Sequence, residues 1–477
     1  MSDSLILRHL DFPLDAARVF PLLAGTARYA FWIDSARTES PMSRFSYVGV
    51  VPENVAVLRV EEAGERDPWT LLEDALVRAP RVASADIANF PELRDELLGG
   101  YVGYFGYEAR RSLRFATPYS SPTPDALWMP AVRYAMIDHL GKRNFLVGDP
   151  EWVATMEATL RRESTSDSAG AGGNGDISES ATPDDGVRRA PKEAGETALT
   201  FPAPNRERYL ADIAQCLHEI YEGNSYEVCL TAETRTALPP QINNQQGIFD
   251  LYCAQRRHNS APYAAFLRCD DHYILSSSPE RFLSITADGV AETKPIKGTI
   301  ARSQDPAEDA RRAEWLAADP KTRAENLMIV DLLRNDLSRV SVPGSVRVPV
   351  LMSVESYSTV HQLVSTVTSQ LREGVSAVGA ASSCFPGGSM TGAPKPSTME
   401  IIDRLERRAR GVYSGALGFF SASGAANLSV VIRTLVVLPN GEVSLSAGGA
   451  IVADSHPDDE YREMLDKLAA ATPPTLR

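Results

Sequence analysis

A lysine that lies between a proline and a glycine is the first candidate for covalent chemistry in this sequence. Lys297 follows Pro295 and directly precedes Gly298 in the stretch Lys294–Thr299. Proline fixes one backbone angle and glycine frees another, so Lys297 is expected on a turn or strand end rather than in a helix. A lysine becomes a nucleophile when its surroundings leave it partly neutral. An isolated lysine is more often an exposed surface residue, so a catalytic interpretation requires a site around it.

A carboxylate on an expected helix could help to build such a site by holding a divalent cation. The sequence predicts a helix over 321–338, with Asp319 as its N-cap, Pro320 in its first turn and Glu325 in its first half. Magnesium takes one or two carboxylates together with waters and substrate oxygens. An isolated glutamate is more often solvated or capping. The apolar face of this helix is expected to consist of Leu327, Val330, Leu333 and Leu337.

The last expected helix carries two more glutamates and a lysine. Ser455 is its expected N-cap, and Asp458 three residues later resembles a capping box. Glu460, Glu463 and Lys467 then share one face, because their spacings are three and four residues. Two glutamates on different helices would suit a magnesium ion, provided that the two helices converge in the fold.

Two further features could bind an anion, and a histidine could take part in catalysis. Arg433 lies within an apolar stretch, Leu428–Val437, that is expected to be a strand. A buried arginine needs an anionic partner, so a role in binding a substrate carboxylate and a structural role are equally open. His361 by itself is more often a structural histidine than a catalytic one. The glycine-rich segment Phe385–Lys395 opens an expected helix around Met399–Leu405, where backbone N–H groups could bind a carboxylate or phosphate or simply form a turn.

The composition limits the partners and the compartment. The 477-residue chain has 43% hydrophobic and 23% charged residues, as ordinary globular proteins do, and a net charge of −14. A nucleic-acid partner is not expected, since phosphate binding needs clustered lysine and arginine. The N-terminus lacks the features of a signal peptide and no long apolar run is present, so no membrane partner is expected. The five cysteines are scattered, which argues against disulfides and a cysteine zinc site and favours a cytoplasmic location.

The chain is expected to have two ordered regions separated by a disordered segment. Residues 1–162 alternate short apolar runs with turns and form an N-terminal lobe. Residues 163–199 cannot bury enough apolar surface to offset the entropy of ordering, so they are expected to be a disordered linker or insertion, and residues 200–477 are ordered again. In the N-terminal lobe the expected strands are Tyr29–Ile33, Phe45–Gly49, Val55–Leu58 and Gly99–Glu108, and the expected helix is Leu71–Val77.

The region from residue 200 onward is expected to mix helices and strands. The periodicity of Arg206–Glu222 predicts a helix that ends at Gly223. A hairpin is expected around Asp270 and Asp271. The other expected strands are Tyr226–Leu230, Val360–Leu371, Leu417–Phe420 and Val443–Ala447.

Taken together, these motifs resemble those of the chorismate-utilising enzymes. The motifs are PIKGT from Pro295, RAENLMIVDLLRNDL from Arg323, PGGSMTGAPK from Pro386, the segment Gly448–Val452 and EYREMLDK from Glu460. The similarity covers most of residues 200–470 and, more weakly, residues 1–160. It implies an α+β fold with a two-sheet β core flanked by helices, in which the N-terminal part is one lobe rather than an independent domain.

Two positions indicate a branch within this family. Anthranilate synthases usually have alanine where this chain has Lys297, and isochorismate and salicylate synthases carry a water-activating lysine where it has Glu227. The chain is instead similar to component I of the aminodeoxychorismate synthases. That resemblance implies the conversion of chorismate and ammonia to 4-amino-4-deoxychorismate, a precursor of 4-aminobenzoate and folate. The alternatives are an anthranilate synthase component I and a non-catalytic homologue that acts as a regulatory subunit.

The resemblance also implies a role for each candidate residue. Lys297 attacks C2 of the ring as the C4 hydroxyl leaves, Glu280 acts as general acid and base, and ammonia then adds at C4 and expels the lysine. Mg²⁺ is the implied cofactor and binds the ring carboxylate of chorismate. Glu325 and Glu463 are implied to hold the metal, with Glu460 nearby. Thr299, His361, Ser389, Tyr413, Arg433, Gly448, Gly449 and Lys467 are implied to contact the substrate.

A partner is implied by a motif that the sequence lacks. None of the five cysteines lies in a Gly-x-Cys-x-Gly elbow, so glutamine-dependent activity needs a separate glutamine amidotransferase subunit that supplies ammonia. The N-terminal lobe of the family often carries a tryptophan pocket, which Ser40 and Arg44–Tyr47 match loosely.

Overall fold

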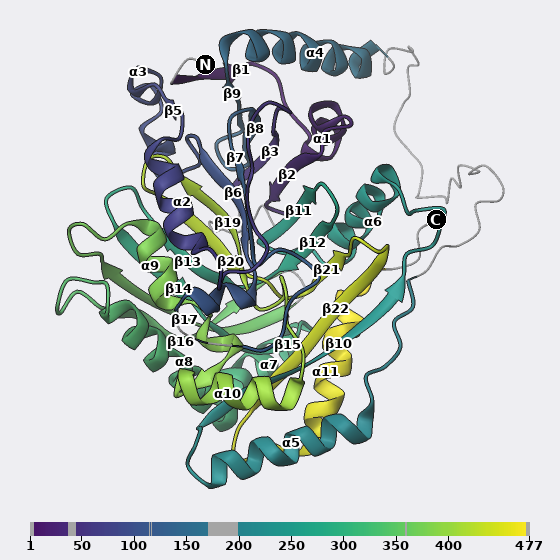
Figure 1. Cartoon of the computed structure of the whole chain (residues 1–477), viewed down its shortest axis with the longest axis vertical. Helices are drawn as coiled ribbons and strands as arrows, with labels where there is room; N and C mark the ends of the chain where they lie inside the picture. The colour runs from purple at the N-terminus through teal and green to yellow at the C-terminus, as the bar shows by residue number, and fades with distance from the viewer. Residues whose placement is uncertain are drawn as a thin grey trace.

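Two large β-sheets form the centre of the molecule, and the helices lie around them (Figure 1). The computed structural model describes residues 4–36, 44–113, 115, 117–169, 199–357 and 360–473. Within these residues one sheet has twelve strands and the other has ten. The expected α+β fold with a two-sheet core flanked by helices is therefore confirmed.

Neighbouring strands of each sheet often come from distant parts of the sequence. In order across the sheet, the twelve-stranded sheet consists of β18 (Gly392–Ala393), β10 (Glu227–Ala237), β22 (Glu442–Ile451), β21 (Thr434–Val437), β12 (Tyr273–Ser278), β11 (Tyr263–Cys269), β2 (Tyr29–Asp34), β3 (Phe45–Val50), β8 (Tyr134–Asp138), β9 (Arg143–Gly148), β1 (Ser4–Leu10) and β5 (Arg81–Val82). The ten-stranded sheet consists of β15 (Ile296–Ala301), β17 (Val360–Gln370), β14 (Val290–Lys294), β13 (Arg281–Ile285), β20 (Ala426–Val430), β19 (Ala416–Ser421), β6 (Gly100–Phe105), β7 (Ala126–Pro130) and β4 (Leu58–Val60), with β16 (Arg347–Ser356) paired to β17.

The helices pack on the outer faces of the sheets and at their ends (Figure 1). The α-helices are α1 (Ala16–Ala24), α2 (Pro68–Val77), α3 (Ser84–Ile87), α4 (Pro150–Ala169), α5 (Arg206–Tyr221), α6 (Gln245–His258), α7 (Pro306–Ala318), α8 (Pro320–Ser338), α9 (Ala377–Cys384), α10 (Lys395–Glu406) and α11 (Pro457–Ala471). Short 3-10 helices lie at Pro91–Leu93, Tyr107–Leu113 and Gly388–Met390.

Strands from both ends of the chain contribute to each sheet. In the twelve-stranded sheet, β2 from the N-terminal lobe pairs with β11, and Phe31 lies opposite Leu267. In the ten-stranded sheet, β6 pairs with β19, and Gly103 lies opposite Gly418. The N-terminal residues therefore complete both sheets and do not form a sheet of their own.

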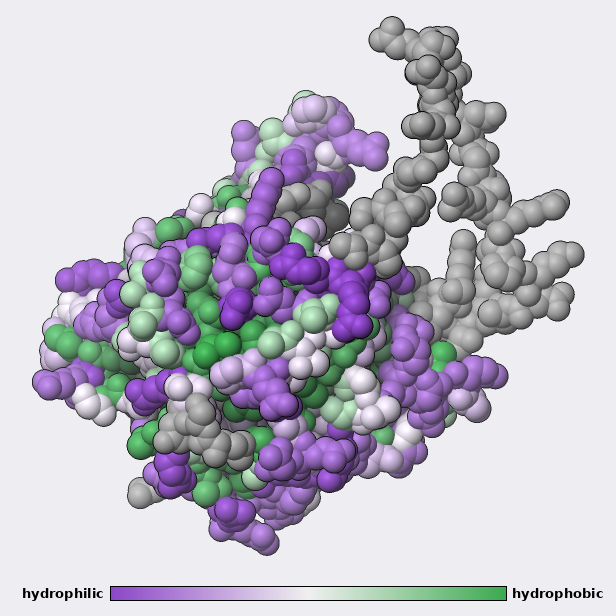
Figure 2. All heavy atoms as spheres, turned by 90° about the horizontal axis from the view of Figure 1, so that it is seen from above, coloured by the Kyte–Doolittle hydropathy of each residue, from purple (hydrophilic) through white to green (hydrophobic). Residues whose placement is uncertain are grey.

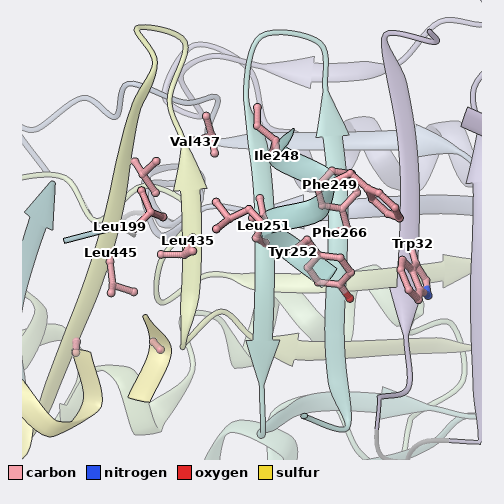
Figure 3. Packing of buried hydrophobic residues seen from close by; sticks show 14 of the residues in the cluster. Trp32, Leu199, Ile248, Phe249, Leu251, Tyr252, Phe266, Leu435, Val437 and Leu445 are labelled. Carbon is pink, nitrogen blue, oxygen red and sulfur yellow. The ribbon is translucent and has the colours of Figure 1, made fainter. Parts of the chain in front are cut away.

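Alternation along the strands sends neighbouring side chains into different cores. Phe31 of β2 packs in the cluster between the two sheets, whereas Ala30 and Trp32 belong to the cluster on the outer face of the twelve-stranded sheet. Figure 3 shows this outer cluster, where Trp32 lies beside Phe249 and Tyr252 of α6. A third cluster covers the outer face of the ten-stranded sheet under α2, α8 and α9. The sheets are thus buried on both faces, which fixes the positions of the loops at their ends.

The expected single strand Leu428–Val437 is wrong, because the structure divides it. Strand β20 ends at Val430 in one sheet, and β21 begins at Thr434 in the other. Residues 431–433 cross between the sheets, and Arg433 has a φ of 51°. The apolar pattern gave no sign of the break, because the residues on both sides of the crossover are buried.

Two further boundaries differ from the expectations. Helix α4 continues to Ala169, past the expected start of disorder at 163, and the hydroxyl of Ser164 donates to the carbonyl of Arg161 at 2.9 Å. Residues 170–198 of the expected linker lie outside the described residues. The strand expected at Val55–Leu58 begins only at Leu58.

The helices that carry the glutamates also differ in detail from the expectations. Leu327 of α8 was expected on the buried face but is 53% exposed. Ile329 is buried in the core beside Val330 instead. Helix α11 begins after His456, so Ser455 is not its N-cap. Instead, the hydroxyl of Ser455 donates to Glu460 Oε1 at 2.7 Å. Sequence spacing located both helices but did not resolve which side chains face inward.

The surface is largely polar. Figure 2 shows hydrophilic residues over much of one face, with smaller hydrophobic areas between them. No described helix has the length and apolar character needed to cross a membrane.

Candidate active site

Two adjoining cavities bring the candidate residues together where β10, β15 and β22 meet α8 and α11. The inner chamber has a volume of about 140 Å³ and the outer chamber about 720 Å³. Glu280, Lys297, Arg433 and Lys467 line both chambers, so the two form one continuous site. The other candidates that line one chamber are Thr299, Glu325, Ser389, Tyr413, Gly448, Gly449, Glu460 and Glu463.

Lys297 lies on β15, where an irregular pairing and a glycine bring the strand close to α8. The register of β15 with β17 shifts between Ile296 and Thr299. Gly298 has a φ of 81°, and a Cβ there would lie 2.4 Å from Thr322 Cγ2 on α8. Glycine is therefore required for this strand to pack against the first turn of α8. Lys297 is the second residue of β15, so the expectation of a turn or strand end rather than a helix is confirmed.

The ammonium of Lys297 is paired with Glu227, the first residue of β10. Lys297 Nζ donates to Glu227 Oε1 at 2.9 Å and lies 4.0 Å from Glu325 Oε2. Burial by itself lowers the pKa of Lys297, but the negative charges of Glu227 and Glu325 outweigh burial and raise the pKa above its ordinary value. Lys297 is therefore protonated in the resting site and must lose a proton before it can attack a substrate.

Glu280 is a buried carboxyl group that titrates near neutral pH. It lies between β12 of one sheet and β13 of the other, and it is 8% exposed. Burial raises the pKa of Glu280 to about 7, and the hydrogen bond with Ser389 and the charge of Lys297 act in the opposite direction. A carboxyl group with this pKa can both donate and accept a proton at physiological pH.

Helices α8 and α11 converge on the outer chamber, as a shared cation site requires. Glu325 comes from α8, and Glu460 and Glu463 come from the first two turns of α11. Lys321 Nζ lies 3.2 Å from Glu460 Oε1 and 3.9 Å from Glu325 Oε1. Lys467 Nζ lies 2.7 Å from Glu463 Oε1. Each carboxylate therefore has an ammonium beside it.

The carboxylate oxygens of the three glutamates are suitable ligands for a hard cation. Within the described ranges, no three His, Cys, Asp or Glu side chains lie close enough together to hold a metal by themselves. Magnesium does not require this, because waters and substrate oxygens complete its shell. Gly449 leaves open space beside the carboxylates: a Cβ there would lie 3.2 Å from Glu460 Oε2 and 3.6 Å from Glu463 Oε1. The residues present fit a cation bound by one or two carboxylates and a substrate oxygen.

The inner chamber presents positive charge and hydrogen-bond donors. Arg433 reaches it from the crossover between the sheets, and the Arg433 carbonyl accepts a hydrogen bond from Ser277 N at 3.1 Å. Burial raises the pKa of Tyr413, so its hydroxyl remains a neutral donor. Lys467 Nζ, at the boundary of the chambers, donates to the Gly448 carbonyl at 2.9 Å. This chamber suits a carboxylate.

A buried arginine that was not a candidate in the sequence connects two segments that line the inner chamber. Arg410 donates to the carbonyl oxygens of Met390 at 2.6 Å and Cys229 at 2.8 Å, and it pairs with Glu406 at 2.6 Å. Met390 lies next to Ser389, so the pairing fixes the loop that contacts Glu280. Several arginines lie close to Arg410 in the sequence, and no sequence signal shows which of them is buried.

His361 is the one candidate that does not line either chamber. Its Nδ1 lies 2.7 Å from Ser356 Oγ, and its Nε2 lies 3.0 Å from Asp309 Oδ1. The next residue of β17, Gln362, faces the outer chamber, and its Nε2 donates to Thr299 Oγ1 at 3.3 Å. Adjacent residues of a strand face opposite sides. Substrate contact by His361 stays a prediction, and this geometry favours Gln362 instead.

The glycine-rich segment is fixed by its lysine. Lys395 Nζ donates to Asp336 Oδ2 at 2.8 Å and to the Cys384 carbonyl at 3.0 Å, and the side chain is buried. The lysine therefore joins the segment to α8 and α9 and does not line either chamber. The segment contributes Ser389 and Met390 to the inner chamber.

Two residues of the outer chamber were missed by the sequence interpretation. Lys321 lies four residues before Glu325 on α8, a spacing that places both side chains on one face and could have been noticed. Gln362 carried no such signal, because the sequence does not reveal which face of β17 is turned to the cavity.

A separate cavity of about 180 Å³ lies where residues of the N-terminal lobe meet residues 262–286 and 417–429. Its lining includes Arg44, Tyr47, Glu96 and Asn427, so it lies near the segment that was compared with a tryptophan pocket. Burial raises the pKa of Glu96 to about 7, and Tyr47 donates a hydrogen bond to its carboxyl group. Ser40 lies outside the described residues. Tryptophan binding stays a prediction.

Known proteins resemble the chain along nearly its whole length. It is 42% identical to the aminodeoxychorismate synthase of Streptomyces pristinaespiralis over 95% of this chain and 62% of that protein. It is 35% identical to aminodeoxychorismate synthase component 1 of Klebsiella aerogenes over 95% of both chains. The crystal structure of anthranilate synthase component I from Streptococcus pneumoniae matches with a TM-score of 0.70 and 25% identity, covering 91% of this chain and 93% of that one. The chain thus spans about three fifths of the Streptomyces relative and nearly all of the Klebsiella one.

The family model described as chorismate binding enzyme matches residues 29–473, which include every candidate residue of the two chambers. The match covers far more than half of the sequence. The chain belongs to the chorismate-binding enzyme family.

Proposed function

We propose that the chain aminates chorismate at C4, as component I of an aminodeoxychorismate synthase. The observation that carries this proposal is the position of Lys297, which lies at the junction of the two chambers beside Glu227. The similarity to relatives named aminodeoxychorismate synthase supports the same reaction. The product is 4-amino-4-deoxychorismate, used for 4-aminobenzoate and folate.

The two chambers suit the two carboxylates of chorismate. The inner chamber receives one carboxylate beside Arg433, Tyr413 and the Gly448 backbone. The ring carboxylate lies in the outer chamber, where a magnesium ion held by Glu325 and Glu463 would neutralise it. This orientation places the ring over Lys297, between the two anion sites, and explains how an acidic protein binds a dianion.

The reaction needs two proton transfers, and a carboxyl group is available for each. Lys297 loses a proton to Glu227, its hydrogen-bond partner, and the freed nitrogen forms a bond to C2 of the ring. The C4–O bond breaks as protonated Glu280 gives its proton to the departing hydroxyl, which leaves as water. Ammonia then bonds to C4 as the bond between Lys297 and C2 breaks. Glu280 takes a proton from the new ammonium group, and Glu227 returns its proton to Lys297.

Magnesium is part of the proposal. Glu325 and Glu463 would hold it, with Glu460 nearby, and the ion would neutralise the ring carboxylate and polarise the substrate. The ammonia source in the proposal is a glutamine amidotransferase subunit. The name component 1 of the Klebsiella relative and the greater length of the Streptomyces relative support such a partner.

A product assay tests this function. The chain is incubated with chorismate, ammonium and Mg²⁺, and the products are identified by liquid chromatography and mass spectrometry. We expect an aminated ring that keeps its enolpyruvyl group. Anthranilate and pyruvate as direct products would identify an anthranilate synthase instead, and no turnover with any amine donor would indicate a non-catalytic homologue. Lys297→Ala serves as the control that lacks the nucleophile, and its melting temperature is measured as well, because the change also removes the ion-pair partner of Glu227.

A further inference from the structure

Lys321 lies at the N-terminus of α8, a position where a lysine does not stabilise a helix. It is the second residue of α8, and the N-terminus of a helix carries partial positive charge that repels a cation. Its partner four residues later, Glu325, lies 3.9 Å away, and the order lysine before glutamate is the weaker one for such pairs. The local sequence therefore does not explain why a lysine occupies this position.

A carboxylate from another helix does explain it. Lys321 Nζ donates to Glu460 Oε1 at 3.2 Å, across the outer chamber. The Glu460 side chain is 3% exposed, and Ser455 Oγ also donates to its Oε1 at 2.7 Å. A carboxylate buried to this extent needs a positive partner. In the metal-free protein that partner is the ammonium of Lys321.

The same ammonium lies between the carboxylates that would hold a cation. It bridges Glu460 of α11 and Glu325 of α8, the two helices whose convergence forms the proposed metal site. Lys467 remains engaged with Glu463 and the Gly448 carbonyl. The side chain of Lys321 is 47% exposed, so it has room to turn toward solvent.

We propose that Lys321 is an internal counter-cation that occupies the divalent-cation position in the metal-free protein and is displaced when the metal binds. This inference rests on the proposed metal site. It explains how the carboxylates of Glu325 and Glu460 remain compatible with a folded chain before the cation arrives. It also makes Lys321 a competitor of the metal, so its removal strengthens metal binding.

The test measures binding of Mn²⁺ alone to the full-length chain, without substrate. Free Mn²⁺ is followed by electron paramagnetic resonance at constant ionic strength. We expect Lys321→Gln to bind Mn²⁺ about fivefold more tightly, as loss of a half-exposed competing charge implies. Lys321→Arg, which keeps the charge, should bind no more tightly than the wild type. Arg323→Gln is the matched control, because it removes the same charge from the same helix outside the cavity lining, and its affinity should not change.

A second readout does not depend on affinity. Without metal, Lys321→Gln should melt at a lower temperature than the wild type, and saturating Mn²⁺ should close the gap. Unchanged or weaker Mn²⁺ binding by Lys321→Gln would overturn the inference. Glu463→Gln separates the two proposals: if it binds Mn²⁺ as the wild type does, or if the wild type binds none, the metal site itself is wrong. If Glu463→Gln weakens binding while Lys321→Gln changes nothing, only the role of Lys321 is wrong.

Discussion

Glu227→Gln removes the charge that faces Lys297 and keeps a side chain of nearly the same size. In the folded protein Lys297 Nζ and Glu227 Oε1 lie 2.9 Å apart, and the two side chains are 12% and 1% exposed. The other carboxylate within reach of Lys297, Glu325, lies 4.0 Å away. The substitution therefore leaves a buried ammonium with one weaker partner.

Two arguments give a similar size for the effect on stability. Breaking a buried ion pair by removing one partner costs about 3–5 kcal/mol. The penalty for the unpaired ammonium in the variant has an upper bound, because Lys297 can instead become neutral. From its ordinary pKa of 10.5, deprotonation at pH 8 costs about 3 kcal/mol. We therefore expect Glu227→Gln to lower the free energy of unfolding by about 3 kcal/mol at pH 8.

The loss should depend on pH in a defined direction. In the wild type the raised pKa of Lys297 contributes stability that is fully present below pH 10.5 and is lost only as pH rises beyond it. In the variant we expect the pKa of Lys297 to fall below its ordinary value. The unfolded chain then binds the proton more tightly, so the stability of the variant rises with pH. The difference between variant and wild type should shrink by about 2–3 kcal/mol between pH 8 and pH 10.

Urea unfolding between pH 7.5 and pH 10 measures both quantities. The matched control is Glu233→Gln on the same strand, where Glu233 pairs with Arg235 at 3.1 Å and both side chains are partly exposed. This control should lose less than about 1 kcal/mol at every pH. A loss below about 1 kcal/mol for Glu227→Gln at pH 8, or a loss that stays constant to pH 10, would show that Glu227 does not hold the charge of Lys297.

Three further predictions concern the chemistry. Lys297→Ala should lower kcat for amination at least about a thousandfold while chorismate still binds, and comparing kcat with an equilibrium Kd checks this; near wild-type turnover would exclude the covalent role. Glu280→Gln should lower kcat/KM about 10²–10⁴-fold. In the wild type we expect activity to fall as pH rises through about 7, because Glu280 then loses the proton that it gives to the departing hydroxyl, and this fall should be absent from the variant. A wild-type pH profile in this variant would contradict the assignment. Gln362→Ala should raise KM for chorismate, whereas His361→Ala should lower the melting temperature with little change in KM, since His361 bonds Ser356 and Asp309.

The arrangement of the sheets was accessible from the sequence only in part. Short apolar runs located β2 and β3, and the cap formed by Asp319 and Pro320 located the start of α8. The crossover at Arg433 was not accessible, because a chain that passes from one buried sheet to another stays apolar throughout. The prediction that Ser455 caps α11 was wrong for a different reason: its hydroxyl donates a hydrogen bond to the side chain of Glu460 instead.

The site was predicted mainly by the family resemblance and less by local chemistry. Spacing placed Glu463 and Lys467 on one face, and the fold brings that face toward Glu325. Glu227 had no assignable role in the sequence, because its partner lies seventy residues away. The same limit applies to Arg410, whose contacts join segments that are far apart in the chain. Such residues acquire a function only through tertiary contacts.

A covalent bond between Lys297 and the substrate ring distinguishes the proposed mechanism from direct amination, and mass spectrometry of the quenched protein can detect it. The chain is mixed with chorismate and Mg²⁺ in the absence of ammonia, quenched in acid and digested. We predict a mass increase equal to chorismate less one water on the peptide that contains Lys297, absent from Lys297→Ala and removed when ammonium is added before the quench. Formation of the aminated product with no adduct on Lys297, or with undiminished turnover in Lys297→Ala, would contradict the covalent mechanism.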